Sequence, residues 1–81
     1  MRDAMEGYHY FVMWDADGWK IQCEGENSEG YPTRGEALRR AVDLAHLDQR
    51  NGRHAKVIVQ GKDSVFRPGW TSGRDPYPPP A

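Results

Sequence analysis

With 81 residues, of which 37% are hydrophobic and 28% charged, the chain has the length of one domain and the composition of a soluble globular protein rather than a disordered one. Cys23 is the only cysteine, which excludes a disulfide within the chain, and no apolar run approaches the ~20 residues of a membrane span. The formal net charge is −1, but acids dominate residues 1–33 and bases dominate residues 34–81. Opposite charges in the two halves suit attraction within the chain, or head-to-tail attraction between copies, at least as well as a polyanionic partner.

The amino-terminal segment MRDAMEGYHY does not read as an export signal, because it contains acidic residues and lacks an apolar core. Together with the lone cysteine, this favours a cytoplasmic location and no membrane partner. We expect residues 1–7 to be a flexible leader that precedes the domain.

The next segment predicts a β-hairpin. Tyr8–Trp14 is dense in aromatic and β-branched residues and is the strongest strand candidate in the chain. Residues 15–18 (DADG) have turn chemistry, with Gly18 suited to the positive φ of a bulge. Trp19–Cys23 alternates between apolar and polar residues, as a half-buried strand does.

A helix is predicted over Thr33–Arg50, after a polar, glycine-rich loop at residues 24–32. Thr33 and Glu36 have the spacing of a capping box, and Gly52 suits the left-handed residue that follows a helix. The apolar stripe expected to meet the sheet consists of Ala37, Leu38, Ala41, Leu44 and Ala45.

The rest of the chain predicts a second hairpin and a tail. Ala55–Gln60 reads as a third strand, and Val65–Arg67 as a short fourth strand that ends or bends at Pro68-Gly69. Residues 71–81 are proline-rich and poor in apolar residues, so we expect a disordered tail after a domain at residues 8–70.

These elements predict the α+β class: a single two-layer domain of β-β-α-β-β order. We expect a four-stranded antiparallel sheet, order 2-1-3-4, with one helix on one face. The strands at Tyr8–Trp14 and Ala55–Gln60 are apolar at both alternations and therefore suit central positions, whereas the other two are mixed, as edge strands are.

One helix covers one face of such a sheet, so apolar residues remain on the other. A bulge at Gly18 would pair Met13 near Ile21 and turn Phe11 and Met13 toward the helix, whereas a different turn register would exchange the two sets. An exposed apolar patch usually marks an interface, unless Trp70 or the tail folds over it. With the bulge, the residues predicted to bind a partner on the uncovered face are Tyr8, Tyr10, Val12, Trp14, Lys20 and Ile58.

Three short motifs occur in the order Asp17–Ile21 (DGWKI), Thr33–Ala37 (TRGEA) and Val57–Asp63 (VIVQGKD). This order resembles the small bacterial proteins of domain-of-unknown-function family 2188, in which a D-G-W-K-V hairpin, a T-K-x-E-A helix start and a V-V-H-G-K-D-G turn recur. The chain departs from that pattern at Ser64, where the family usually has Gly, in its longer basic connection at residues 49–53, and in its proline tail. The resemblance implies a compact α/β domain and carries no known activity or catalytic residues.

No catalytic or metal-binding constellation is evident. Cys23, His9, His46 and His54 match no triad or dyad spacing, and neither a metal-ligand motif nor a phosphate-binding glycine pattern occurs. His46 falls on the polar side of the predicted helix, where we expect it to be solvated. We therefore expect a non-enzymatic protein with no catalytic residues, no metal and no cofactor.

Nucleic-acid binding is the alternative function. Basic residues near the helix exit form a candidate anion patch, and Tyr10, Trp14 and Lys20 could offer a surface for stacking bases. It is disfavoured because carboxylates at Asp15, Asp17, Glu24 and Glu26 flank the same hairpin and would repel phosphates. The candidate patch consists of Arg50, Arg53, His54 and Lys56.

The leading hypothesis is a small association module that binds itself or another protein. A homodimer formed through the uncovered sheet face or an edge strand would bury the apolar residues that one helix leaves exposed.

Overall fold

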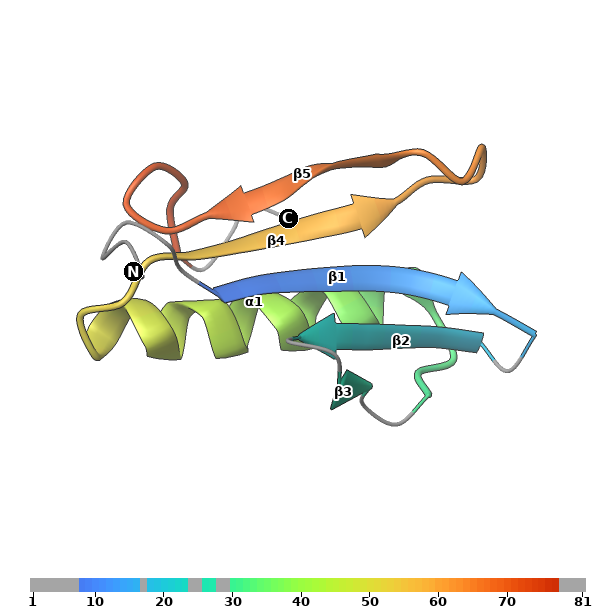
Figure 1. Cartoon of the computed structure of the whole chain (residues 1–81), viewed down its shortest axis with the longest axis horizontal. Helices are drawn as coiled ribbons and strands as arrows, with labels where there is room; N and C mark the ends of the chain where they lie inside the picture. The colour runs from blue at the N-terminus through green and yellow to red at the C-terminus, as the bar shows by residue number, and fades with distance from the viewer. Residues whose placement is uncertain (1–7, 17, 24–25, 28–29, 78–81) are drawn as a thin grey trace, which may run out of the picture.

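The computed structural model describes residues 8–16, 18–23, 26–27 and 30–77. Within these residues, one helix packs against one face of a five-stranded sheet with the strand order β3-β2-β1-β4-β5 (Figure 1). This is the predicted two-layer α+β architecture with one additional short strand. In chain order the elements are β1 (Tyr8–Asp15), β2 (Gly18–Cys23), β3 (Glu26–Asn27), α1 (Arg34–Arg50), β4 (Ala55–Gln60) and β5 (Phe66–Thr71).

The helix begins and ends where its capping residues predict. Thr33 is extended, with φ −135° and ψ 157°, and its hydroxyl accepts a hydrogen bond from the backbone N–H of Glu36 at 3.1 Å. Gly52 follows the last turn with φ +84°, the left-handed conformation that glycine adopts at little cost. The residues that α1 buries are small, which brings its axis close to the sheet; they are Ala37, Ala41, Val42 and Ala45.

The order of the four predicted strands is correct, but the prediction that all of them are antiparallel is wrong. β1 pairs antiparallel with β2, and β4 pairs antiparallel with β5. The two central strands, β1 and β4, run parallel, with Tyr8 beside Ala55 and Val12 beside Val59. The sheet is therefore mixed.

The parallel centre follows from the path between β2 and α1. β3 turns back along β2, where Glu26 pairs with Cys23. Tyr31 then forms a bridge with Trp19 near the start of β2, with backbone N–H···O distances of 2.6 and 3.1 Å. The chain has therefore returned to the other end of β2 before α1 begins. Because α1 then runs back along the sheet, β4 starts at the end of the sheet where β1 starts (Figure 1). β3 and the bridge at Tyr31, both in the segment predicted as a loop, therefore reverse the direction of α1, β4 and β5 relative to the prediction.

The hairpin register also differs from the predicted bulge. Asp15 pairs with Gly18 and Val12 pairs with Ile21, which leaves a two-residue turn. Met13 therefore lies beside Lys20 instead of near Ile21. Because side chains alternate between the two faces of a strand, this single step exchanges the sets that meet the helix and the open side.

The core lies between α1 and the helix-facing side of the sheet. Val12 and Val57 are fully buried, and Trp70 is 2% exposed. Tyr10 is also buried, and its hydroxyl donates to a carboxylate oxygen of Asp48 on α1 at 2.6 Å. The buried cluster comprises Tyr10, Val12, Ile21, Ala37, Ala41, Val42, Ala45, Ala55, Val57, Val59 and Trp70.

β5 continues through Pro68 and Gly69, so the predicted bound at Arg67 is wrong, and of the two outcomes predicted at Pro68-Gly69 the strand shows an irregularity rather than an end. Val57 pairs with Trp70 and Ile58 pairs with Pro68, which leaves Gly69 as the extra residue of a bulge. β5 is an edge strand, so the missing N–H of Pro68 can face away from the ladder. The bulge allows the strand to resume, and Trp70 enters the core.

The first residues of the segment predicted as a disordered tail pack on the domain. Thr71 ends β5, the Trp70 indole N–H donates to the carbonyl oxygen of Pro76 at 2.8 Å, and Tyr77 stacks on His46. His46 is half-buried in this contact rather than solvated. The expectations for residues 1–7 and 78–81 lie outside the described residues.

Candidate functional site

Most of the residues predicted on the uncovered face lie on the helix side of the sheet. Val12 is 0% exposed and Tyr10 9% exposed, so neither can contact a partner directly. Tyr8 packs against the core cluster beneath Arg53, whose guanidinium carbon lies 5.5 Å from the ring centroid. Trp14 reaches the end of the sheet, where its indole N–H donates to the carbonyl oxygen of Gly61 at 3.3 Å. The predicted placement of these four residues is wrong because the hairpin adopts the other register.

The surface opposite α1 carries the alternate residues of the strands, and we call it the open face. Phe11 pairs with Ile58 across the central strands and contacts Phe66 edge-on, with ring centroids 5.8 Å apart. Phe66 is 40% exposed, and Phe11, Met13 and Ile58 are half-buried. Lys20 and Ile58 lie on this side, as predicted. Among the described residues, the open face comprises His9, Phe11, Met13, Lys20, Gln22, Lys56, Ile58, Gln60, Phe66, Pro68 and Thr71.

Two ion pairs lie toward the end of the sheet where β1 ends. Lys20 Nζ lies 3.0 Å from a carboxylate oxygen of Asp15. Arg67 lies 2.9 Å from Asp63, and this hydrogen-bonded pair lowers the pKa of the Asp63 carboxyl to about 2 and raises the pKa of Arg67. Lys20 and Arg67 are therefore each matched by a carboxylate.

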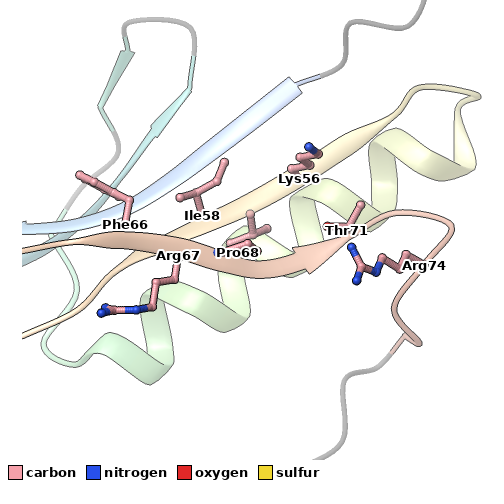
Figure 2. A pocket seen from close by; sticks show the side chains of 8 residues that line it. Lys56, Ile58, Phe66, Arg67, Pro68, Thr71 and Arg74 are labelled. Carbon is pink, nitrogen blue, oxygen red and sulfur yellow. The ribbon is translucent and has the colours of Figure 1, made fainter.

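A shallow hollow of about 190 Å³ lies over β4 and β5, and we call it the β4–β5 hollow. Figure 2 shows Lys56 and Ile58 rising from β4 beside Phe66 of β5, while Arg74 extends back from the turn beyond β5. Among the described residues, the lining includes no carboxylate. The lining residues are Lys56, Val57, Ile58, Phe66, Arg67, Pro68, Thr71 and Arg74.

The predicted anion patch lies at the end of the sheet where α1 ends and β4 begins. Arg50 is the last residue of α1, and Arg53 and His54 form the connection to β4. Arg53 is partly engaged by Tyr8, while Arg50, His54 and Lys56 are exposed. Lys56 also lines the hollow, so the patch continues onto the open face.

The four side chains considered for catalysis lie on separate parts of the described chain: His9 on β1, Cys23 on β2, His46 on α1 and His54 between α1 and β4. Cys23 packs against the core, and no group of three or more His, Cys, Asp or Glu side chains there could hold a metal ion. Burial and the hydrogen bond to Asp48 raise the pKa of the Tyr10 hydroxyl. No helix in the described part of the chain is long and apolar enough to cross a membrane.

The geometry defines a small two-layer α+β protein with one open sheet face. The chain matches the model of the family DUF2188, described as an uncharacterized protein conserved in bacteria, over residues 10–72. It therefore belongs to this family, and the resemblance drawn from its three motifs is confirmed. No curated protein and no solved structure shows significant similarity to the chain.

The side chains that the sequence pattern missed are Phe11, Met13, Phe66, Pro68 and Arg74. A two-residue turn would have placed Phe11 and Met13 correctly, and this register was the alternative left open above. Phe66 faces the open side because it pairs with Gln60, which a tight turn at residues 61–65 could indicate. Arg74 carried no signal, since it falls in the segment expected to be a disordered tail.

Proposed function

We propose that this protein is a non-enzymatic association module that pairs with a second copy of itself through its open face. The observation that supports this is the apolar strip formed by Phe11, Met13, Ile58, Phe66 and Pro68 on the side of the sheet that α1 does not cover. Contiguous exposed apolar surface on a small protein usually marks an interface, because covering it removes apolar area from water.

The sheet edges suit association less well than the face. β3 has two residues, too few to template a further strand. β5 is interrupted by Pro68 and by the bulge at Gly69, which break the row of backbone groups that an added strand would need. These features favour face-to-face packing over strand addition.

The size of the molecule is compatible with a stable dimer. Its principal extents are 35 × 33 × 22 Å, and its accessible surface is 5831 Å². A standard interface buries roughly 800 Å² per partner, about one seventh of this surface. An apolar centre with a polar rim is the usual anatomy of such an interface, and His9, Lys20 and Lys56 would form part of the rim.

Charge favours one arrangement of the two copies. Lys56 and Arg74 lie toward the end of the sheet where β1 begins, whereas Asp15 lies at the other end. A two-fold axis along the strands would place the cationic ends together. An axis across the strands would place Lys56 of one copy over the end of the other copy that carries Asp15, which avoids this repulsion.

The test is the solution mass by size-exclusion chromatography with light scattering. We expect twice the chain mass of 9.2 kDa at high micromolar concentration, and the monomer mass for Ile58→Glu and Phe66→Glu. Leu47→Glu is the matched control, because Leu47 is a 53% exposed apolar side chain on α1, away from the open face. Circular dichroism would verify that each variant folds.

A wild-type monomer at this concentration would contradict the proposal. A dimer that survives both open-face substitutions but dissociates in Leu47→Glu would move the interface to α1.

A further inference from the structure

Two cations of the β4–β5 hollow have no carboxylate partner among the described residues. Lys20 and Arg67 form ion pairs with Asp15 and Asp63. Lys56 and Arg74 are exposed, line the hollow and make no such pair within the part of the chain that the structure describes. When a ligand removes water from them, an ammonium and a guanidinium at one site favour binding of an anion with several acceptor oxygens.

The floor of the hollow is apolar and contains an exposed ring. Ile58, Phe66 and Pro68 line it, and Phe66 presents 40% of its surface to solvent. Phe11 meets the Phe66 ring at an interplanar angle of 90°, which holds the ring in place. An anchored ring beside unpaired cations suits a ligand that has both a flat apolar part and an anionic part.

The cations continue beyond the hollow. Arg53 precedes Lys56 at the same end of the sheet, where Arg50 ends α1. A row of this kind suits a ligand with repeated negative charges better than one with a single anion. Asp75 is close in sequence to Arg74, but its carboxylate accepts the backbone N–H of Thr71 at 2.8 Å and does not line the hollow.

We infer that the β4–β5 hollow binds single-stranded nucleic acid, with a base against Phe66 and Pro68 and backbone phosphates at Lys56 and Arg74. An acidic peptide fits less well, because an extended peptide would add to β5 through backbone hydrogen bonds that Pro68 and the bulge interrupt. Base stacking and phosphate contacts need only the side chains that are present.

This site differs from the nucleic-acid surface that the sequence suggested. Tyr10 lies in the core and cannot stack on a base, and Lys20 is paired with Asp15. Among the carboxylates that argued against that surface, Asp15 ends β1 and does not line the hollow over β4 and β5.

The inference does not depend on self-association, although the two surfaces overlap at Ile58, Phe66 and Pro68. Bound nucleic acid and a second copy would therefore exclude each other. Linkage then requires that an oligonucleotide converts the dimer into a complex containing one protein chain.

The experiment is a fluorescence-anisotropy titration of a labelled oligothymidine of about ten nucleotides, a length typical of single-strand sites. We expect salt-sensitive binding, with log K falling against log[salt] with a slope of about −1.4, because each neutralised phosphate of a single strand contributes about −0.7. The double variant K56Q/R74Q should weaken binding at least about tenfold and flatten this slope. Phe66→Leu keeps apolar volume but removes the ring, and should weaken binding roughly fivefold or more.

The matched control is the double variant R40Q/K62Q, which removes the same net charge from an exposed position on α1 and from the β4–β5 turn. It should bind within about twofold of the wild type, apart from the nonspecific contribution of net charge. Equal loss in both double variants would overturn the inference, as would absence of binding at low salt. Stronger displacement of the label by polyglutamate than by unlabelled oligothymidine of equal charge would assign the hollow to acidic peptides instead.

Light scattering of the same samples separates the two proposals. A wild-type monomer that binds oligothymidine would contradict only the proposed self-association. A dimer that does not bind oligothymidine would contradict only the proposed nucleic-acid site.

Discussion

Tyr77 lies flat on His46, with ring centroids 3.7 Å apart and planes inclined by 4°. The Tyr77 hydroxyl also donates to a carboxylate oxygen of Asp43 on α1 at 2.6 Å. Trp70, beneath this contact, meets both rings edge-on. The chain after β5 therefore closes over the end of the core, with residues that lie beyond the segment matched by the family, 10–72.

Substitution of Tyr77 should destabilise the domain in two steps. Tyr77→Phe keeps the stack on His46 and loses the hydrogen bond to Asp43, so we expect a small decrease in the free energy of unfolding. Tyr77→Ala also loses the stack and uncovers Trp70, so its decrease should be larger. Urea denaturation followed by Trp fluorescence measures both. Equal stability of the two variants would mean that the ring contributes nothing.

Gly69 and Gly35 should respond to alanine with opposite signs. A Cβ at Gly69 would lie 2.7 Å from Val59 Cγ2, so Gly69→Ala should destabilise by about 1–3 kcal/mol through overpacking. A Cβ at Gly35 meets nothing within 4 Å, and Gly35→Ala should stabilise the first turn of α1 by up to about 1 kcal/mol. Thermal denaturation of the pair checks the prediction. A neutral Gly69→Ala would show that β5 can shift away from β4.

Ser64 has φ +68°, in the left-handed region where a side chain is strained. This is the position at which the chain departs from the glycine usual in the family pattern. Ser64→Gly should therefore stabilise the β4–β5 turn by about 1 kcal/mol, the typical cost of this conformation for a residue with a Cβ. The free energy of unfolding in urea measures it, with Ser64→Ala as the control that keeps the strain. A gain in the alanine variant as large as in the glycine variant would refute the explanation.

Tyr10 should make stability sensitive to alkaline pH. Burial and Asp48 raise its pKa above the ordinary value of 10.0, so the stability that its protonated form contributes is complete below pH 10 and is lost as pH rises above it. Tyr10→Phe should cost about 1–2 kcal/mol at pH 7, because it leaves Asp48 without this donor. The gap between wild type and variant should narrow above pH 10 in urea titrations. A constant difference in the free energy of unfolding would show that ionisation of the Tyr10 hydroxyl does not destabilise the folded state in this pH range.

Local signals predicted the elements well. The Thr33 cap, the Gly52 terminator and the spacing of the alanines place α1 within a residue of its observed bounds, since each acts within one turn of the helix. Ala55–Gln60 is also observed as predicted, because its β-branched residues suit a central strand.

The relationships between elements depended on features with weak local signals. A two-residue strand at Glu26–Asn27 reverses the path of the chain, yet it contains no residue typical of strands. The one-residue difference between a tight turn and a bulge at Gly18 decided which of the two alternating sets of β1 side chains faces the helix. The open face was therefore predicted as a feature, while its β1 residues Phe11 and Met13 were assigned to the helix side.

The parallel pairing of β1 with β4 has a consequence for synthesis. β1 begins at Tyr8, and its central neighbour begins at Ala55. In a nascent chain, the aromatic β1–β2 hairpin therefore remains without its partner strand β4 until residues 55–60 have left the ribosome. Nucleation then requires a long-range encounter rather than stepwise zippering from the amino terminus. Folding of this domain is consequently expected to begin only after β4 has left the ribosome, and protection from protease on stalled ribosomes should appear abruptly at that chain length.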